Sequence, residues 1–382
     1  MKTIQYAGLA LVAFVASVIF LLRLPPAGAA ATVQVQTIPP LTQVFPGQEP
    51  VLIRLQALDS QGQPLTNARL QVRLVTPAKT PWLSTDFPIV EGTTLLELKS
   101  TAPEGSLEFS QVLPIRGTYR LEVAVAPGNG GTFQPFEQSL TLSLAEAPLK
   151  FRNLGILLVV LLLVGFAGGW VIGGEQTLQP GEIAPQPVRL LLSGVIVVAI
   201  GVLLYVNITA EFNHGHAGHG HHSHEVVAAK ARQTAQGITA ELTGETHAIV
   251  GQLATQGIQL TEATTGKPAT EALVQVRAID LEHQEPVFAY EASPDTTGRL
   301  TWKQQFYDGA PHQLTVRVVP LPEANRQFAP LQVSHEIEVE AVEPPLLTRL
   351  ISLGYFTIVL VTGLVLGLLG RRRSRPKWVQ PG

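Results

Sequence analysis

The sequence contains no cysteine, and its only methionine is Met1. The absence of cysteine excludes disulfides, zinc–thiolate sites, iron–sulfur clusters and thiol catalysis. The absence of an internal methionine excludes a thioether site for Cu(I). Charged residues are also few, at 14% of the 382 residues, whereas 46% are hydrophobic. This balance is typical of a membrane protein.

Basic residues are concentrated nowhere except at the C-terminal end, and the formal net charge is −3. A nucleic-acid partner requires a basic surface, so we expect no nucleic-acid partner. The sequence also lacks the Gly-x-Ser-x-Gly, phosphate-loop, Gly-x-Gly-x-x-Gly and His-Glu-x-x-His motifs. We therefore expect no enzymatic activity.

An uncharged stretch near the N-terminus, residues 7–22, follows Lys2 and precedes two prolines and a run of small residues. This pattern predicts a signal peptide over residues 1–31, with cleavage before Ala30 or Thr32. The alternative is an N-terminal anchor helix that is not cleaved. In both cases the chain that follows lies outside the cell membrane.

Three further stretches, 153–174, 190–210 and 350–370, hold 21 or 22 residues each without a charge. A bilayer core requires about 20 apolar helical residues, so we predict transmembrane helices over 150–174, 190–210 and 346–370. No Asp, Glu, Lys, Arg or His lies in these stretches, which excludes a proton relay or a charged ion path. Glycines at four-residue spacing predict close helix packing, although glycine is common in all membrane helices: Gly165, Gly169, Gly173, Gly363 and Gly367.

The orientation follows from the basic residues after the last predicted span, because cytoplasmic flanks are enriched in Lys and Arg. The tail 371–382 is therefore predicted to be cytoplasmic, and so is the loop 175–189. Residues 32–149 and 211–345 then lie on the outer, periplasmic face of a multi-pass protein of the inner membrane. Lys150 and Arg152, at the outer end of the first span, oppose this orientation.

The two outer regions repeat one another. Residues 62–73 and 266–277 match at seven positions with a constant offset of 204. Residues 105–125 and 298–318 match at six positions with an offset of 193. The order of the matches is preserved, which indicates a duplicated module. Alternation of apolar and polar residues predicts strands, among others at 51–57, 119–125, 312–318 and 335–340. We predict two antiparallel all-β sandwich modules, 32–149 and 226–345, together with the transmembrane α-helices.

Each copy carries a Gly-x-Pro-x-x-x-Ala-x-x-x-Val pattern, beginning at Gly62 and Gly266, and a later strand that begins at Tyr119 or His312. These features resemble the immunoglobulin-like modules of bacterial exported proteins, including YtkA-like and FixH-like membrane-anchored periplasmic domains. The resemblance implies an accessory protein at the periplasmic face, in some members near copper or respiratory-oxidase handling.

A histidine-rich segment, 211–225, follows the second predicted span and holds six of the ten histidines within 11 residues. Neutral imidazole is a good ligand for Cu, Zn, Ni and Co ions, and interleaved small residues allow several rings to reach one ion. We expect loose, exchangeable, pH-sensitive binding of a divalent transition metal. The candidate ligands are His214, His216, His219, His221, His222 and His224. The alternative is a solvated linker whose histidines are incidental.

The other four histidines, His247, His283, His312 and His335, all lie in the second module, and the first module has none. Two functions follow from these patterns. The first is a membrane-anchored accessory protein that binds a divalent metal at the outer membrane face and presents it to a membrane protein partner. The second is a structural or protein-interaction subunit that uses its two modules within a membrane complex and binds no metal.

Overall fold

The computed structural model describes residues 30–80, 83–128, 130–174, 185, 188–190, 231–322, 324 and 327–373. The predicted signal peptide or anchor, most of the predicted span 190–210, the histidine-rich segment and the tail after residue 373 lie outside these residues. The chain divides into two compact units. One contains the strands, and the other contains two long helices together with residues 78–91.

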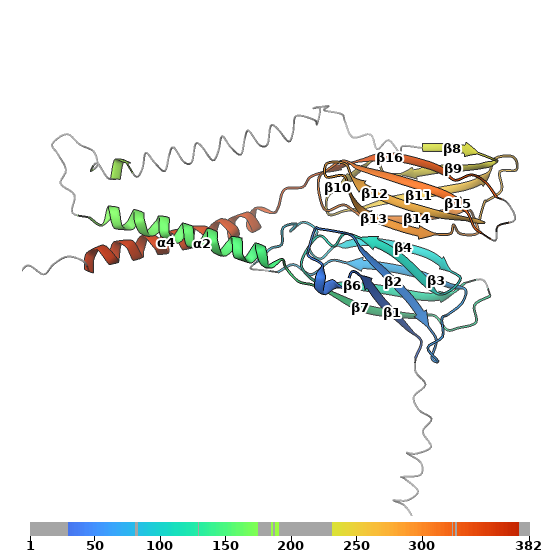
Figure 1. Cartoon of the computed structure of the whole chain (residues 1–382), viewed down its shortest axis with the longest axis horizontal. Helices are drawn as coiled ribbons and strands as arrows, with labels where there is room; N and C mark the ends of the chain where they lie inside the picture. Colours follow the sequence, from blue (N-terminus) through green and yellow to red (C-terminus); the bar gives the residue numbers. More distant parts are fainter. Residues whose placement is uncertain are drawn as a thin grey trace, which may run out of the picture. The chain divides into compact units, whose positions relative to one another are not determined.

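The strand unit consists of two eight-stranded sheets, which confirms the predicted all-β fold (Figure 1). Neighbouring strands are antiparallel except for β10 and β16, which are parallel. The first sheet has the order β1 (Thr32–Ile38), β2 (Val51–Leu58), β5 (Ser106–Gln111), β13 (Glu285–Ala292), β12 (Ala272–Asp280), β15 (His312–Pro320), β16 (Leu331–Glu340) and β10 (His247–Ile249). The second has the order β7 (Phe136–Leu144), β6 (Gly117–Pro127), β3 (Ala68–Val75), β4 (Thr94–Ala102), β14 (Arg299–Gln305), β11 (Leu253–Glu262), β9 (Ile238–Gly244) and β8 (Ala231–Ala235).

The alternation in the sequence determines which face of each strand is buried. Along β16 every second residue from Leu331 to Val339 is buried and the residues between are exposed. The same alternation runs through β3 and β12. The core between the sheets is therefore built from the apolar set of each strand, as period-two patterning requires.

Seven strands in each half of the strand unit have the same order, and the second half adds β8 beside β9 and β10 beside β16. In the first half β1-β2-β5 faces β7-β6-β3-β4, and in the second half β9-β11-β14 faces β16-β15-β12-β13. Gly62 and Gly266 both have positive φ in the turn after the second strand of each copy, and Leu121 and Leu314 are both buried in the equivalent strands β6 and β15. Seven strands in two antiparallel sheets of three and four form an immunoglobulin-like sandwich.

The two modules are joined edge to edge, which the repeat did not predict. β5 pairs with β13 in one sheet, and β4 pairs with β14 in the other, so both sheets continue through the two modules. Because β5 is equivalent to β14 and β4 to β13, exchanging the modules maps one seam onto the other. This relation is that of an isologous, two-fold interface.

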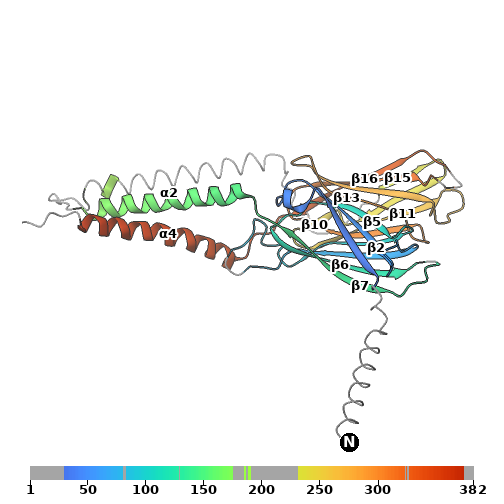
Figure 2. The same cartoon turned by 60° about the horizontal axis from the view of Figure 1, so that its bottom comes forward.

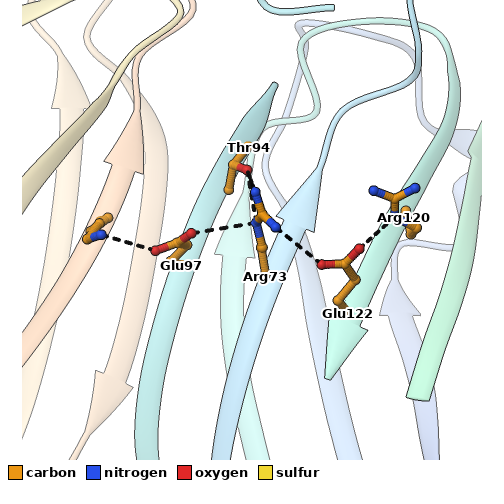
Figure 3. Close-up of polar contacts among 6 residues, drawn as sticks. Arg73, Thr94, Glu97, Arg120 and Glu122 are labelled. Carbon is orange, nitrogen blue, oxygen red and sulfur yellow. Dashed lines mark hydrogen bonds and ion pairs between the residues drawn. The ribbon is translucent and has the colours of Figure 1, made fainter. Parts of the chain in front are cut away.

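A ladder of ion pairs crosses the outer face of the second sheet and connects the modules (Figure 3). Glu97 lies 3.4 Å from Lys303 of the second module and 3.5 Å from Arg73 of the first. The ladder continues from Arg73 to Glu122 at 3.6 Å and from Glu122 to Arg120 at 2.7 Å. Opposite charges thus alternate across β14, β4, β3 and β6, with three cations and two carboxylates.

The second unit contains the helices α2 (Pro148–Ile172) and α4 (Leu346–Arg373), which lie side by side (Figures 1 and 2). Two segments, Pro148–Ile172 and Leu346–Arg371, are long and apolar enough to cross a membrane. A Cβ added at Gly165 would overlap the carbonyl oxygen of Leu360, and one added at Gly363 would overlap that of Leu162. The predicted glycine packing is therefore confirmed, and contacts that advance together along both helices show that the helices are parallel.

At the N-terminal end of α2, one of the two basic residues that oppose the predicted orientation has acidic partners. Lys150 forms an ion pair with Asp86 of the 78–91 segment and lies 3.5 Å from Glu146. Two carboxylates therefore balance this one ammonium group at the start of the helix.

Candidate functional site

The six predicted metal ligands between His214 and His224 lie outside the described residues, so the structure does not place them. The chain enters the described part again at Ala231, the first residue of β8. β8 lies beside β16, because the backbone N–H of Gln332 donates to Gln233 Oε1 at 3.1 Å and that of Ala329 donates to Gln236 Oε1. The order of these two contacts places Ala231 toward His335.

The four histidines of the second module all lie at one end of that module. His247 on β10 is paired in register with Glu338 of β16, and His312 on β15 is paired with Ile337 of β16. His335 on β16 is paired with Leu314, the second residue after His312. His283 lies in the turn after Asp280, which is paired with His312. Neighbouring strands are about 4.8 Å apart, so the histidines follow one edge across β12, β15, β16 and β10.

His335 occupies a core-facing position of β16 with 9% of its surface exposed. Neither ring nitrogen has a hydrogen-bond partner within the described residues. Burial lowers the pKa of His335, so the ring is held in its neutral form. A buried polar group without a partner costs stability.

His312 is held in place by the backbone. Its Nδ1 lies 2.7 Å from the carbonyl oxygen of Ala310, and because a carbonyl only accepts, Nδ1 carries the proton. The ring packs against Phe306 with centroids 4.6 Å apart. Burial lowers the pKa of His312.

The equivalent position in the first module is Tyr119, whose buried hydroxyl donates to the carbonyl of Ile115 at 2.6 Å and accepts from the N–H of Ile115 at 2.9 Å. This contact is the tyrosine corner of immunoglobulin-like folds. His312 therefore replaces a structural side chain.

The two exposed histidines each have one carboxylate partner. His283 Nδ1 lies 2.9 Å from Asp280 Oδ2, and this hydrogen bond raises the pKa of His283. His247 Nδ1 lies 3.3 Å from Glu338 Oε2. Each pair provides one imidazole that a neighbouring carboxylate orients.

Within the described residues, no three or more His, Asp or Glu side chains are grouped so that they could hold a metal ion. The four histidines of the second module thus share one end of the module, but each is engaged singly. The sequence showed that they belong to one module. It did not show that they meet at one end, because that depends on the register of β15, β16 and β10.

No protein-family model matches the chain, and no curated protein matches it. Among solved structures, the chain is similar to invasin, a bacterial integrin-binding protein, at 11% identity over 82% of this chain and 40% of that chain, with a TM-score of 0.20. It is similar to the D0-D1 domain of intimin at 8% identity over 77% of this chain and 91% of that one, with a TM-score of 0.19. It is similar to α-2-macroglobulin from Escherichia coli at 10% identity over 81% of this chain and 16% of that chain, with a TM-score of 0.22. These scores carry no functional argument, and the immunoglobulin-like assignment rests on the strand order.

Proposed function

We propose that this chain is a membrane-anchored accessory protein, without enzymatic activity, that binds a divalent transition metal ion (Cu, Zn, Ni or Co) at the outer face of the membrane. The ligands are the imidazoles of the histidine-rich segment. The observation that carries the proposal is the gathering of His247, His283, His312 and His335 at one end of the second module, beside the strand β8 that follows the segment.

The chemistry of the segment favours a site that loads and releases its ion. Six interchangeable rings on a chain rich in glycine provide three or four ligands in many combinations, and fixing each ring costs conformational entropy. The four histidines of the second module provide single imidazoles at the end of the module where β8 begins. This arrangement suits transfer of an ion to a membrane protein partner better than permanent storage.

The joined modules, the parallel helices and the distribution of charge in the sequence support a multi-pass protein with both modules on the periplasmic face. The modules form one sandwich, so they lie on the same side of the membrane. Because α2 and α4 are parallel, the chain must cross the membrane an odd number of times between them. The uncharged residues 190–210 have the length for that crossing. Arg371 and the basic residues after it assign the far ends of the helices to the cytoplasm.

The resemblance to YtkA-like and FixH-like domains fits this proposal, because those domains are periplasmic and membrane-anchored. The N-terminal signal peptide remains a prediction from the sequence.

Metal binding is tested by calorimetry on the full chain in detergent, purified without a histidine-affinity step. Titration with each divalent ion should release heat at pH 7.5 and much less at pH 5.5, because protonated imidazole cannot ligate and its ordinary pKa is about 6.5. Replacing the six histidines of the segment by Asn should abolish binding, whereas the control variant His247→Gln/His283→Gln should retain most of it. Equal heat at both pH values, or undiminished binding without the six histidines, would refute the proposal.

The orientation is tested with single cysteines, which the chain otherwise lacks. Ser106→Cys and Ser293→Cys, one in each module, should both react with a membrane-impermeant thiol reagent on cells whose outer membrane is permeabilised. Labelling of either one only after lysis would show that its module lies in the cytoplasm.

A further inference from the structure

The junction between the modules opens at one end. β4 and β14 pair at three positions only, Leu96–Leu98 with Trp302–Gln304, although β4 continues to Ala102 and β14 begins at Arg299. In the described part of the chain, no strand pairs with the facing edges of residues 99–102 and 299–301. The residues of these edges line a hollow of about 750 Å³, which we call the junction cleft.

Three cations surround the junction cleft. Arg69 on β3 is paired in register with Thr101 on β4, and Lys99 lies on the same outer face two residues before Thr101. Continuing the register of β4 and β14 places Arg299 opposite Thr101 on its other side. Residues on one face are about 6.8 Å apart along a strand and about 4.8 Å apart between strands. All three exposed side chains line the cleft, and residues with hydroxyl groups line it as well: Ser100, Thr101, Thr270, Ser293, Thr296 and Thr301.

Acidic residues offset the charge of these cations only in part. The nearest ladder of carboxylates, Glu97 and Glu122, is already paired with Arg73, Arg120 and Lys303 (Figure 3). Arg69, Lys99 and Arg299 make no ion pair within the described residues. One carboxylate, Asp295, lines the cleft, and its Oδ1 accepts hydrogen bonds from Thr297 and from the N–H of Arg299. Three cations and one carboxylate leave a net charge of +2.

The duplication provides an internal comparison for this cleft. A second hollow, of about 450 Å³, lies at the equivalent seam between β5 and β13. By the repeat and the strand register, Leu273, Glu291 and Ser106 occupy the places of Arg69, Lys99 and Arg299. The fold therefore produces the hollow twice, but the cations gather at only one of the two. Their clustering is not a consequence of the fold.

We propose that the junction cleft binds an extended acidic segment of a partner polypeptide. The free edges of β4 and β14 supply main-chain donors and acceptors, as in recognition by strand addition. The side chains of Arg69, Lys99 and Arg299 bind the carboxylates of the segment. This site lies at the opposite end of β14 from the four histidines of the second module, because Arg299 begins β14 whereas Phe306, just after its end, packs against His312.

Binding is tested by fluorescence anisotropy on the full chain in detergent micelles. The probe is a labelled decapeptide of alternating Glu and Thr, and the matched control peptide alternates Lys and Thr. The acidic peptide should bind and the basic one should not. Raising the salt concentration from about 50 mM to about 500 mM should weaken binding, because the Debye length shortens.

Two variants with the same loss of charge identify the site. Arg69→Gln/Lys99→Gln/Arg299→Gln should weaken binding about tenfold or more. Lys267→Gln/Arg277→Gln/Arg317→Gln, three exposed cations elsewhere on the second module, should change it less than about twofold. If thermal unfolding shows that the first variant is destabilised, the single exposed change Lys99→Glu should weaken binding in the same direction.

Four results would overturn the proposal. The first is a wild-type chain that does not bind the acidic peptide. The second is an equal loss in both triple variants, which would show binding by net charge alone. The third is an acidic peptide with alternate main-chain nitrogens methylated that binds as well as the unmodified one, because strand addition requires those donors. Tighter binding of chondroitin sulfate than of the peptide would likewise replace the polypeptide partner with an anionic glycan.

Discussion

The tyrosine corner of the first module allows a stability change to be worked out from contacts. In Tyr119→Phe the ring and its packing are retained and only the hydroxyl is lost. Burial raises the pKa of Tyr119, so the group removed is the neutral hydroxyl. Its loss leaves both the N–H and the carbonyl of Ile115 without their partner, in a residue that is 1% exposed. A buried donor or acceptor without a partner costs about 1–3 kcal/mol, so we expect a loss of about 2–4 kcal/mol in the free energy of unfolding.

The assay is urea unfolding of the full chain in detergent, followed by thermal unfolding. For a unit of this size the expected loss corresponds to a decrease of about 5–15 °C in melting temperature. Tyr290→Phe is the matched control, because the Tyr290 hydroxyl is also buried but donates to the carbonyl of Lys99 at the longer distance of 3.3 Å. We expect about 1 kcal/mol there. If Tyr119→Phe were no more destabilising than Tyr290→Phe, the two hydrogen bonds to Ile115 would not hold the corner.

Two further substitutions test the core and the helix pair. His335→Leu should stabilise the chain by about 1–2 kcal/mol at neutral pH, because it removes two buried nitrogens without partners. Since burial lowers the pKa of His335 below its unfolded value of about 6.5, the wild type should lose stability as the pH falls through and below 6.5, and the variant should lose less in urea unfolding at pH 7.5 and 5.0. Gly169→Leu should lower the melting temperature in detergent, because a Cβ there would overlap the carbonyl of Leu364, whereas Gly155→Leu, with open space around it, should not. Equal melting temperatures for the two glycine variants would show that the helices do not pack through this face.

The sequence predicted those parts of the fold that depend on local patterns. Period-two alternation located strands such as β16, and uncharged runs located α2 and α4. Glycine spacing predicted the face through which the helices pack. The pairing of β5 with β13 could not be predicted in this way, because alternation specifies the buried face of a strand and not the neighbour of its edge. The gathering of the histidines at one end and of the cations around Thr101 could not be predicted either, because both depend on strand register.

The duplication extends beyond the sandwich, because each of the two units, taken by itself, contains a two-fold relation between its halves. In the strand unit β5 meets β13 as β14 meets β4. In the helix unit Gly165 meets Leu360 as Gly363 meets Leu162, and all four positions fit one offset of 198 residues. An isologous contact of this kind is the contact of a symmetric dimer. The repeated element is therefore a module together with the helix that follows it.

In the proposed topology, two such elements in one chain require an additional membrane crossing. If α2 crosses the membrane, the chain after it is on the far side, and a second module can join the first only if the chain returns. The proposed span 190–210 would supply that return, and the histidine-rich segment comes directly after it. The two copies share one fold and differ in two respects. The cations lie at one seam only, and the histidines lie in one module only. These two differences accompany the two sites that we propose, a partner site at the junction cleft and a metal site on the histidine-rich segment that precedes the second module in the chain.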